Sequence, residues 1–329
     1  MRIAVIGDGG WGTTLSLLLH KKGYDVIQWG AFPEYVNYLR KKRVNTKFLP
    51  GIKIPEAIDL TSDIKEATCG AQLVVLAPPS QYMRDVAGRI AHCKLPRSTV
   101  FLSVSKGIEN KTLLRMSEVI RKVLGPVRLA VLSGPTISHE VVRKMPTAVV
   151  AASGDKNIAR FIQKVFLTDR FRVYTSKDVA GVELGGSLKN VIAISAGMVD
   201  GMGFESNTKA GLLSRGLAEA ARLGVKMGAK KETFYGISGL GDLVTTCISK
   251  YGRNRWLGEE IGKGKKLKDV LKNTEMVVEG VKTAESAYQL SRRHKVEMPI
   301  TQQVYSVLYK GKDPRKAIHD LMTRAPREE

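Results

Sequence analysis

Few cysteines, few aromatic residues and no long apolar run characterise this 329-residue sequence. Its three cysteines, Cys69, Cys93 and Cys247, are odd in number and form no CxxC pair, which argues against a disulfide framework or a cysteine zinc site. No apolar run approaches the roughly 18 residues of a membrane-spanning helix, and the apolar stretch after Arg2 is too short for a signal peptide. We therefore expect a cytoplasmic protein with reduced thiols and no membrane span.

Acidic residues are also scarce. The chain has 31 Asp and Glu against 53 Lys and Arg, which gives a formal net charge of +22. The basic residues are dispersed, and the aromatic residues, 6% of the chain, are not interleaved with them as in a surface that stacks nucleic-acid bases. The charge thus predicts a solvated basic surface that attracts small anions, and no nucleic-acid partner.

Short β-branched runs alternate with longer amphipathic runs in the first half of the chain. A helix is expected at Trp11–Lys22 and another at Asn157–Phe166. The predicted strands are Ile3–Ile6, Asp25–Trp29, Leu73–Leu76, Thr99–Val104, Arg128–Leu132 and Thr147–Ala152. This alternation is typical of a doubly wound parallel sheet with crossover helices on its faces.

The pattern changes near residue 180. From Val182 onward, helical periodicity replaces the strand signals, with Leu188 and Ile192 on one apolar stripe. We therefore predict an α/β Rossmann-type dinucleotide-binding domain over residues 1–180. An all-α substrate-binding and catalytic domain is predicted over residues 181–329.

A glycine-rich segment directly follows the first predicted strand. Gly7-Asp8-Gly9-Gly10-Trp11-Gly12 fits the dinucleotide-binding pattern G-x-G-x-x-G. Gly7 permits the tight turn, Gly9 lets the backbone approach a pyrophosphate, and Gly12 allows close packing of helix on strand. The free N–H groups of the following helix would bind the phosphates. A glycine-rich turn in an unrelated α/β fold is the alternative, but the position between strand and helix favours a dinucleotide.

The tip of the second predicted strand bears on which dinucleotide is bound. An acidic residue there selects the ribose hydroxyl of NAD(H), whereas an arginine accommodates the 2′-phosphate of NADP(H). The sequence runs Trp29-Gly30-Ala31-Phe32-Pro33-Glu34, and Glu34 is expected in the next helix. With neither residue type at the tip, both NADP(H) and NAD(H) are permitted, and the missing carboxylate favours NADP(H).

Several downstream motifs, in this order, resemble the NAD(P)-dependent glycerol-3-phosphate dehydrogenase family, most of all its bacterial biosynthetic form. The resemblance covers the chain from Ile3 to about Leu308. The segments that carry it are Ser105–Glu109, Ser133–Thr136, Gly181–Asn190 (GVELGGSLKN), Asp200–Phe204, Gly239–Leu243 (GLGDL) and Gly252–Arg255 (GRNR).

The resemblance implies a reaction and a set of site residues. The reaction is interconversion of dihydroxyacetone phosphate and sn-glycerol 3-phosphate, which supplies phospholipid synthesis, with Lys189 as acid/base. Lys106 and Asp242 join Lys189 as catalytic residues. The substrate-binding residues implied are Lys106, Gly134, Thr136, Lys189, Asn190, Asp242, Thr246, Gly252, Arg253 and Asn254. The cofactor-binding residues are Gly7, Gly9, Gly10, Trp11, Gly12, Ala31, Lys106, Ser138, Arg253, Val277 and Glu279.

The residues themselves are consistent with a lysine acid. Reduction of a ketone needs a proton donor for the developing alkoxide, and the Lys189 ammonium, in an apolar stretch, can supply it. Asp242 in its glycine-flanked turn is the carboxylate that orients this cation, the N-cap of the next helix, or both. Histidines lie outside such motifs, His139 being the one alternative, and no His-rich cluster has metal-ligand spacing.

Two other functions compete with this interpretation. A β-hydroxyacid or 6-phosphogluconate-type dehydrogenase also joins a Rossmann domain to a helical domain and uses a helix-borne lysine. A basic regulatory protein could keep the fold as a dinucleotide sensor. GLGDL followed by GRNR favours the phosphorylated triose, and we expect a homodimer that acts on a phosphorylated small molecule.

The +22 charge leads to a prediction on substrate capture. If the basic surface steers the dianionic substrate, kcat/KM falls as salt rises, because ions screen long-range attraction. Initial rates at low substrate concentration across a salt series test this. A flat series would mean that the surface charge has no part in capture.

Overall fold

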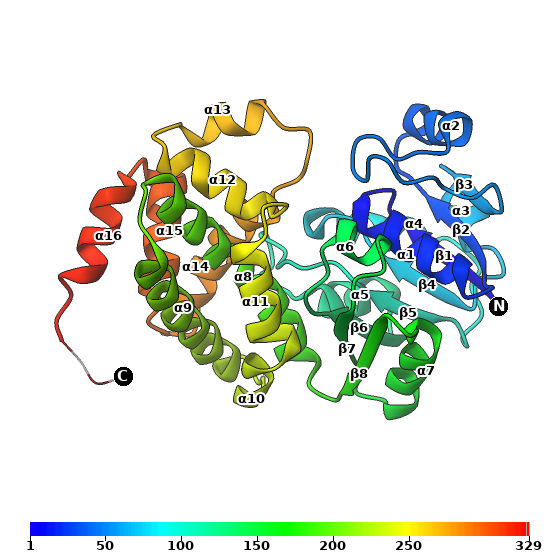
Figure 1. The fold of residues 1–329 in the computed structure, drawn as a ribbon. Coiled ribbons are helices and arrows are strands. Elements are labelled where there is room, and N and C mark those ends of the chain that lie inside the picture. The colour runs from blue at the N-terminus through cyan, green and yellow to red at the C-terminus, as the bar shows by residue number, and fades with distance from the viewer. Residues whose placement is uncertain (327, 329) are drawn as a thin grey trace. The chain divides into compact units, whose positions relative to one another are not determined.

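The computed structural model describes residues 1–326 and 328 of the chain, which divides into two compact units. The first comprises Met1–Lys106 and Leu114–Glu183, and the second comprises Gly107–Leu113 and Leu184–Glu329. The first unit contains one eight-stranded sheet, and the helices α9 to α16 belong to the second (Figure 1).

The sheet of the first unit has the strand order β3-β2-β1-β4-β5-β6-β7-β8. Its strands are β1 (Arg2–Ile6), β2 (Asp25–Trp29), β3 (Ile58–Thr61), β4 (Leu73–Leu76), β5 (Val100–Ser103), β6 (Arg128–Ser133), β7 (Thr147–Ala152) and β8 (Phe171–Ser176). The first six are parallel and follow the 3-2-1-4-5-6 order of dinucleotide-binding folds. The predicted α/β Rossmann-type class is therefore confirmed.

Helices cover both faces of this sheet (Figure 1). Alternate residues of β1 enter different cores: Ile3 and Val5 join one apolar cluster, whereas Ala4 and Ile6 join the other. A strand buried on both faces is apolar throughout, as LVVL of β4 shows. The helices are α1 (Gly10–Lys21), α2 (Pro33–Lys42), α3 (Ile64–Thr68), α4 (Met83–Ala91), α5 (Met116–Leu124), α6 (Ser138–Val142) and α7 (Lys156–Phe166).

Two strands, β3 and β8, and the direction of β7 differ from what the sequence predicts. β3 is a four-residue edge strand interrupted by the exposed Asp59, so its apolar signal is weak. β8 is the other edge, with only Phe171 and Val173 buried. Its neighbour β7 runs antiparallel to β6, which corrects the expectation of an all-parallel series.

The second unit is all helical apart from loops, in agreement with the predicted class. Helix α8 (Val179–Gly201) begins in the first unit and continues into the second. The other helices are α9 (Ser206–Lys226), α10 (Lys231–Tyr235), the π-helical turn η2 (Ile237–Gly241), α11 (Asp242–Ile248), α12 (Arg253–Gly262), α13 (Leu267–Lys272), α14 (Glu279–Arg293), α15 (Pro299–Lys310) and α16 (Pro314–Met322).

Helix α8 is buried on every side, which corrects the expectation of a single apolar stripe. All residues from 181 to 199 are buried. It approaches α12 backbone to backbone: a Cβ atom on Gly197 would overlap the carbonyl of Arg255, and one on Gly258 would overlap the carbonyl of Ile194. The two glycine pairs, Gly197/Gly201 and Gly258/Gly262, therefore set this close crossing.

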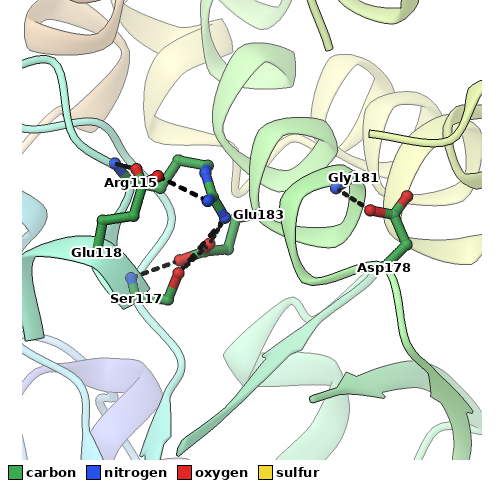
Figure 2. A network of polar contacts seen from close by, with 6 residues as sticks. All are labelled: Arg115, Ser117, Glu118, Asp178, Gly181 and Glu183. Atoms are coloured by element: carbon green, nitrogen blue, oxygen red, sulfur yellow. Dashed lines mark hydrogen bonds and ion pairs between the residues drawn. The ribbon is translucent and has the colours of Figure 1, made fainter. Parts of the chain in front are cut away.

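Two buried carboxylates hold the starts of α5 and α8 in the first unit (Figure 2). Glu183 of α8 accepts hydrogen bonds from Ser117 N at 2.7 Å and Ser117 Oγ at 2.6 Å, and it pairs with Arg115 at 2.6 Å. Asp178 accepts from Gly181 N at 2.9 Å in the first turn of α8. Burial raises the pKa of Glu183, whereas the Arg115 guanidinium opposes that shift.

Another carboxylate caps α15 in the second unit. Met298, the N-cap residue, offers no side-chain acceptor, and Pro299 follows it. Glu219 of α9, 2% exposed, instead accepts from Ile300 N at 2.6 Å and from Thr301 N at 3.1 Å. These are two of the unpaired N–H groups at a helix start.

Glu219→Ala should therefore destabilise the protein by about 1–3 kcal/mol, because buried N–H groups of α15 lose their acceptor. Burial raises the pKa of Glu219 from its ordinary value of 4.5 to about 7, so the folded state holds this proton more tightly than the unfolded chain does. Between those values the stability that Glu219 contributes falls as pH rises. Urea unfolding should show the advantage of the wild type over Glu219→Gln shrinking from about pH 5 to about pH 8; a constant difference would contradict this.

Candidate functional site

The glycine-rich segment lies at the carboxyl end of β1, with each glycine in a different environment. Gly7 has a φ of +136°, and a Cβ atom there would lie 2.8 Å from the carbonyl oxygen of Ala77. One on Gly12 would overlap the carbonyl of Gly7, whereas one on Gly9 would meet nothing within 4 Å. Gly7 and Gly12 thus allow the backbone segments around them to pack closely, whereas the backbone at Gly9 is open to a ligand.

Helix α1 starts beside that open backbone without a side-chain cap. Gly9 is its N-cap residue, and the first turn holds no acidic side chain. Gly10 lies close to Ser138 at the start of α6: a Cβ atom on Gly10 would be 3.7 Å from Ser138 Oγ. The free N–H groups and the partial positive charge at the start of α1 suit a pyrophosphate. The residues present therefore fit a dinucleotide. Trp11 lies in the same first turn, and Ala31 is exposed after β2.

The expectation that no carboxylate stands at the tip of β2 is wrong in three dimensions. A Cβ atom on Gly30, the residue after β2, would overlap Oδ2 of Asp8 and lie 2.8 Å from its Cγ. Asp8 belongs to the glycine-rich segment and was treated only as one of its variable positions. The signal that could have identified it is an acidic residue in that segment combined with a glycine at the strand end.

Lys106 lies in the first unit with two of the other predicted substrate residues. Its ammonium donates to the carbonyl oxygen of Gly134 at 2.7 Å and to Thr136 Oγ1 at 3.0 Å. Gly134 directly follows β6, has a φ of +138° and is buried. These three residues are therefore neighbours.

The strongest polar constellation of the second unit is centred on Lys189. The Lys189 ammonium, on the fully buried α8, forms an ion pair with Asp242 and donates to Thr246 Oγ1 at 2.5 Å. Thr246 Oγ1 in turn donates to the carbonyl oxygen of Asp242 at 2.7 Å. Lys189 is 7% exposed and Asp242 1% exposed. Among the described residues these are the hydrogen-bond partners of the ammonium, so one of its three N–H groups is left for a ligand.

Asp242 reaches Lys189 because of an irregular turn. The π-helical turn η2 precedes α11, and Asp242 is the first residue of α11 with helical backbone angles of −72° and −32°. Its side chain forms the ion pair with Lys189, which is one of the two contacts that the sequence left open. Such π-helical turns are frequent at functional sites.

The predicted phosphate-binding residues begin helix α12. Arg253 is exposed and donates through Nη1 to the carbonyl oxygen of Val277 at 2.8 Å, and Gly252 is the N-cap residue. Asn254 is buried; its Nδ2 donates to Asn190 Oδ1 at 2.9 Å, and its Oδ1 accepts from Gly280 N at 2.9 Å.

The first two residues of α12, Arg253 and Asn254, make different contacts. Asn254 links α8, α12 and α14. Arg253 is the first residue of α12, and its guanidinium contacts the carbonyl of Val277. Glu279 begins α14, next to Gly280.

The candidate site residues thus form one group in each unit. Gly10, Ser138, Lys106, Gly134 and Thr136 lie in the first. The groups around Lys189 and Arg253 lie in the second. Among residues 1–326 and 328, no cluster of three or more His, Cys, Asp or Glu side chains could hold a metal ion. In the same residues, no helix combines the length and apolarity needed to cross a membrane.

Comparison with known sequences gives a consistent assignment along the chain. The family described as NAD-dependent glycerol-3-phosphate dehydrogenase matches with its N-terminal part over residues 2–159 and with its C-terminal part over residues 178–319. A protein of Geobacter sulfurreducens named glycerol-3-phosphate dehydrogenase (NAD(P)+) is 52% identical over 326 residues, covering 98% of this chain and 97% of its own. One of Syntrophotalea carbinolica with the same name is 50% identical over 332 residues, covering 100% of this chain and 99% of its own.

Comparison with solved structures agrees. The crystal structure of glycerol-3-phosphate dehydrogenase from Coxiella burnetii superposes with a TM-score of 0.95 at 36% identity, covering 98% of this chain and 99% of that one. Sequence and fold therefore lead to the same conclusion, which the motifs had suggested: the chain belongs to the NAD-dependent glycerol-3-phosphate dehydrogenase family.

Proposed function

We propose that this chain catalyses the interconversion of dihydroxyacetone phosphate and sn-glycerol 3-phosphate with NAD(P)H or NAD(P)+. The observation that carries the proposal is the buried Lys189–Asp242–Thr246 group, in a chain that matches the family over nearly its full length. A buried ammonium with one uncommitted N–H is suited to a substrate oxygen that gains negative charge.

Lys189 is the general acid in reduction and the general base in oxidation. Bound nicotinamide supplies or accepts the hydride at the carbonyl carbon. Lys189 donates a proton to the carbonyl oxygen as it becomes an alkoxide, and Asp242 and Thr246 hold the ammonium in place. A positioned acid of this kind contributes about 10²–10⁴-fold to the rate.

The phosphate of the substrate requires an anchor apart from the proton donor. Arg253 offers a guanidinium at the first turn of α12, where N–H groups are unpaired. Gly252 brings the backbone close, and Asn190 and Asn254 fix this helix start to α8. We assign Lys106, Gly134 and Thr136 to substrate contact from the first unit, with Lys106 also near the cofactor.

The cofactor residues follow from the open backbone at Gly9 and the uncapped start of α1. We assign Gly7, Gly9, Gly10, Trp11, Gly12, Ala31 and Ser138 to the dinucleotide, together with Arg253, Val277 and Glu279. Residues 1–180 are proposed as the dinucleotide-binding domain and residues 181–329 as the substrate domain. We further propose a cytoplasmic homodimer whose product supplies phospholipid synthesis.

Purified protein should oxidise NADPH or NADH when dihydroxyacetone phosphate is added, as followed by nicotinamide absorbance. Lys189→Met should lower kcat by about 10²–10⁴-fold, because the proton donor is lost. Dinucleotide binding without turnover of this substrate would overturn the proposed reaction and lead to a panel of hydroxyacids.

Two further variants separate lost chemistry from lost folding. Lys189→Met leaves the buried Asp242 carboxylate without its partner, which destabilises proteins by about 3–5 kcal/mol. The double variant Lys189→Met, Asp242→Asn removes both charges, so it should be more stable than the single variant and equally inactive. Lys226→Met, at an exposed position of α9, should retain wild-type activity.

The two directions should have different pH optima. Reduction requires the ammonium form of Lys189 and oxidation requires its neutral amine, so kcat for oxidation should peak at higher pH. Initial rates at saturating substrate in each direction measure this. Coincident optima would exclude Lys189 as the group that exchanges the proton.

A further inference from the structure

A buried carboxylate oxygen without a donor lies at the edge of the dinucleotide site. Oδ2 of Asp8 is inaccessible to solvent and accepts no hydrogen bond from any described residue, although Asp8 as a whole is partly exposed. A buried, unsatisfied carboxylate oxygen is unfavourable and calls for an explanation. Because that oxygen is closed off beside Gly30, a ligand would contact the part of Asp8 that remains exposed.

The carboxylate occupies the space in which a side chain at the tip of β2 would project. β1 and β2 are parallel with Ile6 opposite Trp29, and Gly7 N donates to Trp29 O at 2.9 Å, so Asp8 follows directly beside Gly30. A Cβ atom on Gly30 would overlap Asp8 Oδ2 and lie 2.7 Å from a methyl group of Val36. The glycine at position 30 therefore leaves room for the Asp8 carboxylate.

The peptide of Asp8 is held in place by a fully paired asparagine. Asn45, 0% exposed, donates through Nδ2 to the carbonyl oxygen of Asp8 at 2.7 Å and to Thr13 Oγ1 at 2.7 Å. Its Oδ1 accepts from Tyr35 at 2.8 Å and from Phe48 N at 3.1 Å. All four hydrogen-bonding positions of this amide are used, so the loop that carries Asp8 is fixed to α1 and to the segment after α2.

We propose that Asp8 determines the cofactor preference of this chain: its carboxylate accepts hydrogen bonds from the adenosine ribose hydroxyls of NAD(H) and repels the 2′-phosphate of NADP(H). In dinucleotide-binding folds an acidic residue at the end of the second strand binds these hydroxyls. Here the acid comes from the glycine-rich segment instead, while the strand end is Gly30. This inference rests on the proposed function only for the binding of a nicotinamide dinucleotide.

The charge of Asp8 is compatible with both effects. Burial raises its pKa to about 6, so the carboxylate is mostly ionised at neutral pH. An ionised oxygen is a strong acceptor for a hydroxyl, and it disfavours a second anion at the same place. This reverses the preference for NADP(H) that the sequence of the strand tip suggested.

Equilibrium binding of NADH and NADPH, followed by nicotinamide fluorescence or calorimetry, tests the proposal without turnover. The wild type should bind NADH at least about tenfold more tightly than NADPH. Asp8→Asn keeps the shape and removes the charge, so this ratio should fall about tenfold, with NADPH binding improved. Glu34→Gln, which removes an exposed carboxylate from the first turn of α2, should leave the ratio unchanged.

A wild-type measurement keeps the test independent of how the variants fold. Adenosine 5′-monophosphate should compete with NADH more strongly than adenosine 2′,5′-bisphosphate does. If the bisphosphate competes better, or if Asp8→Asn binds both dinucleotides with the wild-type ratio, Asp8 has no such role and the proposed reaction is unaffected. If the wild type binds neither dinucleotide, the proposed function fails together with this inference.

Discussion

The buried ion pair between Lys189 and Asp242 is the interaction around which the second unit is arranged. Removing two charges from water is costly, and the cost is offset only where the partners are close and their remaining hydrogen-bonding groups are used. Thr246 contributes to that by accepting from the ammonium and donating to the backbone of Asp242. A hydrophobic pair would stabilise such a core at least as well. The energetic cost of this pair is consistent with a charge that is kept for the proposed chemistry.

Placing a lysine in the interior requires that its helix be enclosed. The burial of residues 181–199 of α8 depends on close packing, and glycines make that possible where α12 crosses it. Because the same crossing brings the start of α12 against Asn190, the Arg253 guanidinium is positioned by the packing that buries Lys189. The proposed acid and the proposed phosphate anchor are thus consequences of one arrangement of helices.

Carboxylates distant in sequence supply acceptors at the starts of two helices. Glu219 supplies acceptors for the start of α15, where the N-cap residue is Met298. Glu183 does the same for α5 while it pairs with Arg115 (Figure 2). Burial raises the pKa of each carboxyl, and the hydrogen bonds that it accepts oppose that shift.

The sequence by itself determined the fold class, the strands of the sheet interior and the position of the glycine-rich segment, because buried strands and phosphate-binding turns depend on residues adjacent in the chain. It also identified Lys189 and Asp242 through short motifs. It missed β3 and β8, whose edge positions leave only a few apolar residues, and the antiparallel direction of β7. Only the tertiary structure decided that Asp242 faces Lys189 and that Asp8 occupies the space beside Gly30. Both outcomes depend on which backbone segments pack together, and no spacing along a single segment encodes that.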